Sequence, residues 1–480
     1  MLICGRGAVN RALEQAPPGY IYLCQYFLQC KSRQPEVPSG NPVSSMPVQP
    51  TREVVKSASH TLLSFQHWKA RVVLWGAGAA VGAAAVAFAW LADAAQAAFR
   101  RMHGVHPLWP WLVAPLGFAA ISWLTRRFFP GAEGSGIPQT IHALRPDSGD
   151  QEAALLKPKV VAGRMLLAGA ALLSGASIGR EGPTVHVGAA VARFFARWMP
   201  HAAQPGQRRA LVLAGGAAGV AAAFNTPLAG IVFAIEELSR SFEERASGVA
   251  LTAVILAGVI SIALTGDYTY FGQPVVAAEF HNLSMGVIAV ALAGGLAGGL
   301  FSRITLLGVA AVRSRLSKAQ TARPIVFAAL CGAVVAAVGY FADSLTYGTG
   351  YSEARSILEG HAHLPWYYAP ARAVATLAAY LSGVPAGLLA PSLSVGAGLG
   401  QTVADFGGQP TAIPFAIVGM CGYLAGVTQA PLTSLVIVME MTTQHAMILP
   451  LMVAAALATA TSKLLSPPLY RTLAQERYAP

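Results

Sequence analysis

The segment SGASIGREGP (residues 174–183) occurs again, in altered form, as SGVPAGLLAP (residues 382–391). A second match follows each copy, since NTPL at residues 225–228 corresponds to QAPL at residues 429–432. The two matches occur in the same order and at nearly the same separation in both halves of the chain. Apolar segments broken by Gly and Pro at corresponding positions of two halves are typical of transporters whose binding site lies at the membrane midplane.

The composition is that of a polytopic membrane protein. Hydrophobic residues make up 54% of the 480 residues and charged residues 11%, whereas soluble domains carry about 25% charged residues. This composition excludes a disordered chain and argues against a soluble globular fold. Ten apolar stretches contain no Asp, Glu, Lys or Arg. Several have the length of one spanning helix, two are far too long for one, and residues 165–179 are short. These stretches are residues 72–92, 102–125, 165–179, 210–235, 246–266, 280–302, 324–342, 373–404, 406–439 and 441–462.

The charge and the motif content exclude other classes of protein. The net charge of +12 does not indicate nucleic-acid binding, because no cluster of Lys and Arg with aromatic residues accompanies it. Membrane proteins commonly collect Lys and Arg in their cytoplasmic loops. The five cysteines and the histidines show no spacing typical of a metal site, and no nucleotide-binding motif occurs. We therefore expect neither a metal nor a cofactor.

The distribution of polar and apolar residues predicts the domain organisation. Residues 1–69 are polar, and we expect them to form a cytoplasmic, largely disordered N-terminal tail. Residues 70–266 are expected to form the first membrane repeat, residues 267–282 a linker, and residues 283–472 the second membrane repeat. Residues 473–480 are expected to form a short C-terminal tail.

Arg180 and Glu181 are the most informative charged pair, because they interrupt a long uncharged stretch. Ionisable groups at membrane depth are costly and usually line a pathway. The flanking Gly179, Gly182 and Pro183 favour a helix start with free backbone N–H groups, which binds anions. A Glu carboxylate there could itself occupy the anion site and leave when protonated. The alternative is that the pair lies at a helix end near the membrane interface.

Two further helix breaks of the same kind are predicted. The first is GSGIP, in which two Gly residues expose the backbone, a Ser offers a hydroxyl donor and Pro starts a helix. The alternative for this segment is an ordinary Gly-rich loop. The second is GLLAP, with backbone N–H groups ahead of another Pro. Neutral donors suit a conducting site, since an anion that they hold can also leave. The residues are Gly134, Ser135, Gly136, Ile137 and Pro138 in the first break, and Gly387, Leu388, Leu389 and Pro391 in the second.

A second acidic pair, Glu236 and Glu237, follows an uncharged stretch and precedes a charged segment, so it lies near an interface. One interpretation is a proton port, where a carboxylate at the water boundary passes protons inward. The other is a solvated helix end. Glu440 corresponds to Glu236 in the repeat, and it could simply cap or brace a helix.

Taken together, these motifs resemble the CLC family of chloride channels and chloride/proton exchangers. The resemblance covers roughly residues 70–472 and implies an all-α polytopic membrane protein with two inverted-topology repeats of broken, tilted helices. It also implies a homodimer with one pore per subunit. The short segment after Tyr470 resembles the prokaryotic members, which lack C-terminal regulatory domains. The matching segments are GSGIP, GREGP (residues 179–183), AFNTPLAG (residues 223–230) with the acidic pair that follows, and PLY (residues 468–470).

The resemblance also implies which residues would hold the anion. Ser135 and Tyr470 would donate side-chain hydroxyls to a central chloride. The backbone N–H groups of Leu388 and Leu389 would contact the same ion. Leu389 stands where the family usually has Phe, so the backbone donor is retained while the side chain differs.

The two acids would carry protons. Glu181 would be the gate and the external proton carrier, and Glu237 the internal proton acceptor found in exchangers. We therefore expect a chloride/proton antiporter in a bacterial inner (plasma) membrane, whose partners are chloride, protons and the lipid bilayer, with no nucleic acid. The closest alternative is a passive voltage- or pH-gated chloride channel on the same fold.

Two other classes fit the sequence less well. An intramembrane enzyme would need a nucleophile paired with a base, or a metal-ligand cluster, and neither is apparent. We therefore expect a transporter and not an enzyme. A cation or amino-acid transporter would need acidic clusters that face the pore, whereas the predicted site consists of helix starts and hydroxyls.

Overall fold

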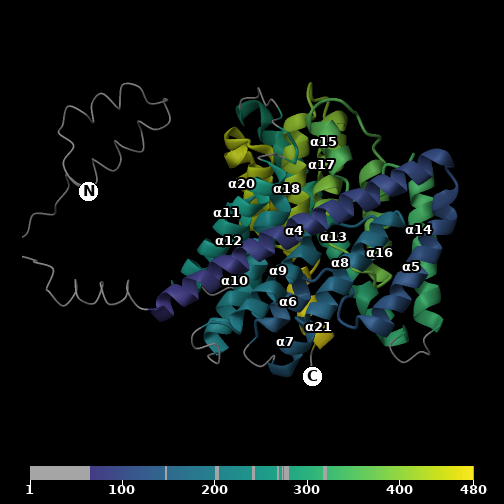
Figure 1. The fold of residues 1–480 in the computed structure, drawn as a ribbon. Coiled ribbons are helices and arrows are strands. Elements are labelled where there is room, and N and C mark those ends of the chain that lie inside the picture. Colours follow the sequence, from purple (N-terminus) through teal and green to yellow (C-terminus); the bar gives the residue numbers. More distant parts are fainter. Residues whose placement is uncertain are drawn as a thin grey trace, which may run out of the picture. The chain divides into compact units, whose positions relative to one another are not determined.

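The computed structural model describes residues 65–145, 149–199, 205–239, 244–266, 270–272, 274, 280–316 and 322–478 (Figure 1). Within these residues every regular element is a helix, and the only β-type pairings are two isolated bridges. The all-α class predicted from the sequence is confirmed.

The helices fall into two series that follow one another along the chain. The first series is α4 (Phe65–Val105), α5 (Trp109–Phe128), α6 (Ile137–Ala143), α7 (Gly149–Leu155), α8 (Pro158–Leu173), α9 (Glu181–Ala196), α10 (Pro205–Phe224), α11 (Pro227–Phe233), a π-helical segment (Ala234–Ser239) and α12 (Glu244–Thr265). The second series is α13 (Phe280–Leu316), α14 (Ala322–Phe341), α15 (Tyr351–Leu358), α16 (Tyr368–Leu381), α17 (Leu389–Phe406), α18 (Ile413–Thr428), α19 (Pro431–Thr442), a short 3₁₀ turn (His445–Met447), α20 (Ile448–Lys463) and α21 (Leu469–Tyr478).

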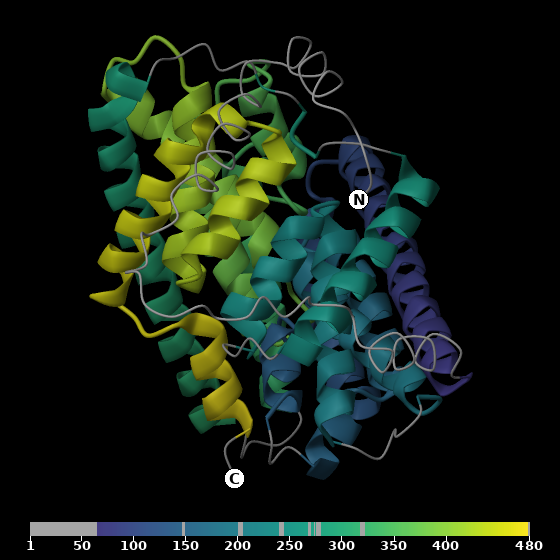
Figure 2. The ribbon, with the colours of Figure 1, turned by 90° about the vertical axis from the view of Figure 1, so that its left-hand side faces the viewer.

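The helices of the two series pack in the same pattern, as the repeat in the sequence predicts. In the first series α9 packs on α10, α10 on α12, and α4 on both α10 and α12. In the second series α17 packs on α18, α18 on α20, and α13 on both α18 and α20. The helices α5 and α14, which correspond to each other, pack together. In Figure 2 the first series (purple to teal) lies to the right and the second series (green to yellow) to the left.

Glycine allows the inner helices of each half to approach very closely. A Cβ atom built on Gly188 of α9 would lie 2.1 Å from the carbonyl oxygen of Gly215 in α10. At the corresponding contact between α17 and α18, a Cβ on Gly396 would lie 2.4 Å from the carbonyl oxygen of Gly419. Small residues are the usual means of close helix packing in membranes, where the hydrophobic effect does not drive helices together. The high Gly content therefore serves this packing.

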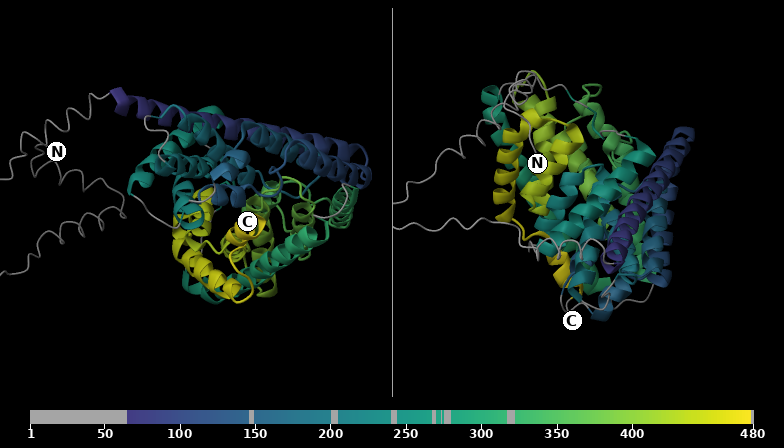
Figure 3. Two further views of the ribbon diagram at one scale, coloured as in Figure 1. Left: turned by 90° about the horizontal axis from the view of Figure 1, so that it is seen from below. Right: turned by 60° about the vertical axis from the view of Figure 1, so that its left-hand side comes forward.

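Four of the described helices are long and apolar enough to cross a bilayer. They contain Trp68–Val105, Met285–Arg315, Ala322–Phe341 and His445–Lys463. Among them α4 runs along one side of the helices it contacts, as Figure 3 shows from two further directions. Leu292, Leu296 and Leu300 form an exposed apolar stripe on α13, as expected for a lipid-facing surface. Several remaining helices are short, which agrees with the prediction of broken helices.

The ends of the expected segments differ slightly from the helix bounds. The helix α4 begins at Phe65, inside the tail expected over residues 1–69, whose earlier part lies outside the described residues. Most of the expected linker, residues 267–282, also lies outside them. The helix α21 continues to Tyr478, so it includes most of the segment that was expected to be a tail after residue 472.

Candidate functional site

The three predicted helix breaks meet at one place. Gly179 and Gly387 form an antiparallel bridge, with N–H···O distances of 2.8 Å and 3.0 Å. Gly134 donates to the carbonyl of Val384 at 3.3 Å, and its own carbonyl accepts from the Ala386 N–H at 3.2 Å. These bonds connect the two repeats. They bring the starts of α6, α9 and α17 together, although the three motifs are far apart in the sequence.

Two of these helix starts have no side-chain cap of their own. Arg180 is the N-cap of α9 and Leu388 is the N-cap of α17, and neither helix has a capping side-chain hydrogen bond. The first backbone N–H groups of a helix have no partner within it, and the helix dipole favours negative charge there. The arrangement can therefore bind an anion, or a carboxylate, between the two starts.

The carboxylate of Glu181 lies between these helix starts. Its side chain is fully buried, and Oε2 accepts a hydrogen bond from the backbone N–H of Ala390 at 3.3 Å. Oε1 accepts a second hydrogen bond, from the hydroxyl of Tyr351 at 2.6 Å. A residue on α9 thus caps α17 of the other repeat. The donor Ala390 directly follows Leu389, whose N–H was predicted to bind the anion.

Glycine is required around this carboxylate. A Cβ atom on Gly179 would lie 2.2 Å from Oε2 of Glu181, and a Cβ on Gly182 would lie 2.5 Å from Oγ of Ser135. Any other residue at either position would therefore occupy the space of the predicted ligands. This is the physical reason for the glycines of the GREGP segment.

Ser135 and Tyr470 supply two buried hydroxyls at the same site. Their exposed fractions are 1% and 0%, and the two hydroxyls are near enough to interact. Neither makes a hydrogen bond of normal geometry to any residue that the structure describes. Buried polar groups nearly always have a partner, and the lack of one is costly. These two buried hydroxyls are therefore suited to bind one anion that accepts a hydrogen bond from each of them.

Arg180 points away from the anion site. Its guanidinium donates to Asp93 of α4 at 3.0 Å, to the carbonyl of Ala89 at 3.2 Å and to the hydroxyl of Tyr270 at 2.6 Å. The positive charge of Arg180 therefore holds the start of α9 against α4. The neutral character predicted for the anion site is retained.

The two acids of the second pair have different surroundings. Glu236 accepts hydrogen bonds from the N–H groups of Leu432 at 3.1 Å and Thr433 at 2.7 Å, so it caps α19. Glu440 caps α11 in the same way, with the N–H groups of Leu228 at 3.1 Å and Ala229 at 2.7 Å. The cap suggested for Glu440 is thus confirmed, and Glu236 has the matching role in the repeat.

Glu237 is buried, with an exposed fraction of 3%, in the π-helical segment after α11. It lines a depression of about 340 Å³ together with Glu236, Lys463 and Arg471. Arg471 also donates to the backbone carbonyls of Glu236 at 2.6 Å and Glu237 at 3.4 Å. Both acids thus lie at the wall of this opening, but they differ because Glu236 caps α19 and Glu237 is the more deeply buried of the two.

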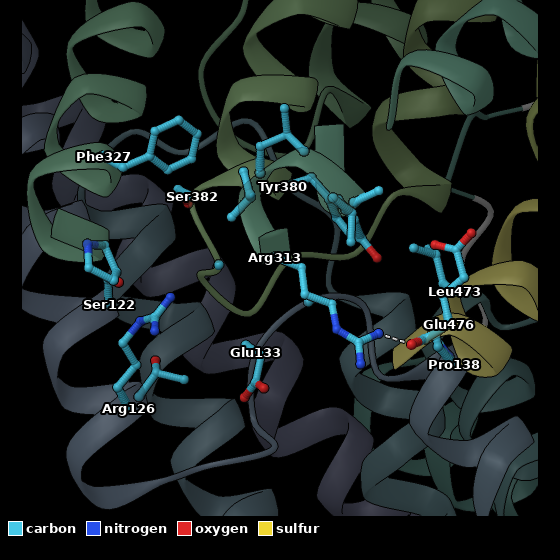
Figure 4. A pocket seen from close by; sticks show the side chains of 18 of the residues that line it. Ser122, Arg126, Glu133, Pro138, Arg313, Phe327, Tyr380, Ser382, Leu473 and Glu476 are labelled. Atoms are coloured by element: carbon cyan, nitrogen blue, oxygen red, sulfur yellow. Dashed lines mark hydrogen bonds between the residues drawn. The ribbon is translucent and has the colours of Figure 1, made fainter. Parts of the chain in front are cut away.

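A second cavity, of about 480 Å³, reaches the loop that carries Ser135 (Figure 4). Its lining includes Gly134 and Pro138 on either side of that residue, and Tyr380 and Leu473 from the second repeat. Arg126, Glu133 and Arg313 are labelled around it in Figure 4, where Arg313 binds the carbonyl of Glu476. Among the described residues, the two cavities have no lining residue in common.

Comparison with known proteins agrees with this geometry. The family described as voltage-gated chloride channels matches residues 117–463. The H⁺/Cl⁻ exchange transporter ClcA of Cronobacter sakazakii is 33% identical over 390 residues, which cover 76% of this chain and 80% of that protein.

Solved structures show the same fold. A slow cyanobacterial Cl⁻/H⁺ antiporter aligns with a TM-score of 0.73 and 24% identity, over 85% of this chain and 98% of that chain. A eukaryotic CLC transporter aligns with a TM-score of 0.71 and 19% identity, over 86% of this chain and 75% of that chain. The fold is thus that of a multi-pass membrane protein with two inverted-topology repeats, as predicted. The chain belongs to the CLC family of voltage-gated chloride channels and transporters.

Proposed function

We propose that this protein is a chloride/proton antiporter. The observation that carries the proposal is the buried carboxylate of Glu181, which lies at the helix start where chloride would bind. A side chain in this position excludes the anion when ionised and admits it when protonated, so the two ions are coupled. The relative from Cronobacter sakazakii is named an exchange transporter for the same two ions, which supports the proposal.

Chloride would bind between neutral donors. The hydroxyls of Ser135 and Tyr470 lie buried at the site and make no hydrogen bond of normal geometry to any described residue. The N–H groups at the start of α17, from Leu388, Leu389 and Ala390, would complete the shell. No full cationic charge is needed, and an ion held by dipoles can leave again. The cavity of about 480 Å³ beside Ser135 would lead chloride to these donors from one side.

Protons would take a different route on that side. Glu237 lines the separate depression of about 340 Å³, so it can exchange protons with water there. From Glu237 a proton would pass to Glu181, whose neutral form leaves the anion site. Two separate openings, one beside Ser135 and one at Glu237, would allow chloride and protons to move in opposite directions without sharing one channel to the surface.

The remaining parts of the proposal concern assembly and location. We propose a homodimer with one pore per subunit, in the inner membrane of a bacterium, with residues 70–266 and 283–472 as the two membrane repeats. Residues 1–69 would then lie in the cytoplasm. Transport as proposed needs no metal or cofactor and no enzymatic step, because the driving force is the gradient of either ion.

Reversal potentials in proteoliposomes test the proposal. With opposed chloride and proton gradients, an antiporter reverses at a potential that depends on both ions, so changing the pH on one side shifts it. A reversal at the chloride Nernst potential that does not move with pH would replace the antiporter with a passive channel.

Tyr470 provides a test of the anion site. Replacing Tyr470 by Phe removes one neutral hydrogen bond to chloride, worth about 0.5–1.5 kcal/mol, so affinity should weaken about two- to tenfold. Tyr470→Ala should weaken binding further and reduce coupling, because it also opens the site beside Ser135. Titration calorimetry measures the chloride affinity of both variants. Unchanged chloride affinity in both folded variants would exclude Tyr470 from the site.

A further inference from the structure

We propose that Tyr351 is a positioning residue that latches the ionised carboxylate of Glu181 in the anion site and thereby weakens chloride binding. This inference rests on the proposed role of Glu181. The carboxylate has two hydrogen-bond donors in the structure, and they come from different helices. Ala390 binds one oxygen at 3.3 Å and the hydroxyl of Tyr351 binds the other at 2.6 Å.

The two donors differ in what else they can bind. The N–H of Ala390 belongs to the helix start where chloride would bind, so chloride and the carboxylate compete for it. The hydroxyl of Tyr351 contacts the carboxylate alone among the groups of the proposed site. The Tyr351 hydrogen bond therefore stabilises the closed arrangement without contributing to the chloride-bound one.

The main chain of Tyr351 is held rigidly. It is the first residue of α15, and its N-cap, Gly350, has a φ of +88°. The carbonyl of Gly350 accepts a hydrogen bond from Ser394 of α17 at 2.9 Å. Arg372, which is fully buried, donates to the carbonyls of Leu345 at 2.9 Å and Gly348 at 2.7 Å. The loop before α15 is thus fixed against the helix that Glu181 caps.

The ring of Tyr351 is held by a second tyrosine. Tyr270 stacks on it with ring centroids 4.9 Å apart and an interplanar angle of 28°. The hydroxyl of Tyr270 accepts from Arg180 at 2.6 Å and donates to the carbonyl of Ala223 at 2.8 Å. The guanidinium of Arg180 lies 5.5 Å from the Tyr270 ring centroid and 5.9 Å from that of Tyr351. Arg180 directly precedes Glu181 and binds Tyr270, so it holds both the backbone of Glu181 and, through Tyr270, the ring of Tyr351.

Calorimetric titration of purified full-length protein with chloride tests the latch. In Tyr351→Phe the ring stack is kept and only the hydroxyl is lost. Since hydrogen bonds to charged groups are stronger than neutral ones, chloride should bind about ten- to a hundredfold more tightly at neutral pH. In a Glu181→Gln background the same substitution should leave the chloride Kd unchanged, because no carboxylate remains to be latched.

A matched control separates the latch from a general effect of losing a buried hydroxyl. Tyr347 is also a buried tyrosine, but its hydroxyl donates to the carbonyl of Ala336 at 3.1 Å. Tyr347→Phe should leave the chloride Kd unchanged. An unchanged Kd in folded Tyr351→Phe would overturn the latch. A change of equal size in the Glu181→Gln background would also overturn it, because the effect would then not act through Glu181.

The pH profile of chloride flux gives a second readout. The Tyr351 hydroxyl stabilises the closed arrangement, so its loss should favour chloride flux under conditions where the wild-type site is closed. In Tyr351→Phe chloride flux should therefore fall less than wild-type flux as the pH is raised. Arg180 and Tyr470 are the other charged or titratable groups that interact with Glu181, and both are unchanged in this variant.

The calorimetric result does not depend on whether the protein exchanges protons. If wild type reverses at the chloride Nernst potential, the antiporter proposal fails while the titrations still decide the latch. If wild type exchanges both ions and the Kd and pH profile of Tyr351→Phe equal those of wild type, the latch fails alone.

Discussion

Replacing Glu181 by Gln is expected to abolish proton coupling while chloride flux persists and loses its dependence on pH. The amide has the shape of the protonated carboxyl and cannot carry a proton. It also lacks the negative charge that the start of α17 stabilises, so it competes poorly with chloride for the Ala390 N–H. Simultaneous measurement of chloride efflux and proton uptake in proteoliposomes checks both parts of the expectation.

The burial of Glu181 makes a large effect of this substitution expected. The carboxylate is fully inaccessible to solvent, and both of its oxygens are bound by protein donors. A neutral substitute must either leave this place or remain there with weaker bonds, and either outcome favours chloride. Uphill proton pumping by the Glu181→Gln variant would refute the role of Glu181 as gate and proton carrier.

The anion site could be predicted from the sequence to the extent that motifs mark it. Three Gly-rich breaks were found in the sequence, and the resemblance to the CLC family assigned them to one site. The structure joins them through the bonds of Gly179 with Gly387 and of Gly134 with Ala386. The cap made by Glu440 also followed from the repeat. The breaks were predictable because backbone geometry requires Gly and Pro at defined positions.

Tyr351 was not predicted, although the sequence contains a signal for it. The segment GTGY (residues 348–351) corresponds to GSGI (residues 134–137). The repeat therefore extends beyond the two matches that begin at residues 174 and 225. Both segments lead into a helix through a Gly with left-handed φ, +96° at Gly136 and +88° at Gly350. The first helical residue is Ile137 in one repeat and a tyrosine in the other, and only the tyrosine can donate to Glu181.

Contacts between distant side chains could not be derived from the sequence. Arg180 was expected near the anion pathway, but it binds Asp93 and Tyr270, and no local pattern indicates either partner. The resemblance to the CLC family implied a proton-accepting role for Glu237 and not for Glu236. Which acid faces which way depends on the π-helical segment Ala234–Ser239, whose extra residue per turn changes the direction of side chains.

Replacing Glu237 by Gln is expected to stop proton movement and to leave chloride permeation in place. Glu237 lines the depression of about 340 Å³, which is separate from the cavity beside Ser135, so its loss removes a proton acceptor without obstructing the anion. A glutamine at this position is similar in size but cannot be protonated and deprotonated near neutral pH. Proton flux should fall to the level of empty liposomes, and the reversal potential should move to the chloride Nernst potential.

Glu236→Gln is the matched control, because it makes the same chemical change one residue away. Glu236 is engaged by the N–H groups of Leu432 and Thr433, so its loss should lower thermal stability by weakening the cap of α19 while proton flux remains close to wild type. The two substitutions therefore separate a proton acceptor from a structural carboxylate at one opening. Equal, wild-type proton flux in both variants would leave Glu237 without a role in transport and would favour the passive channel.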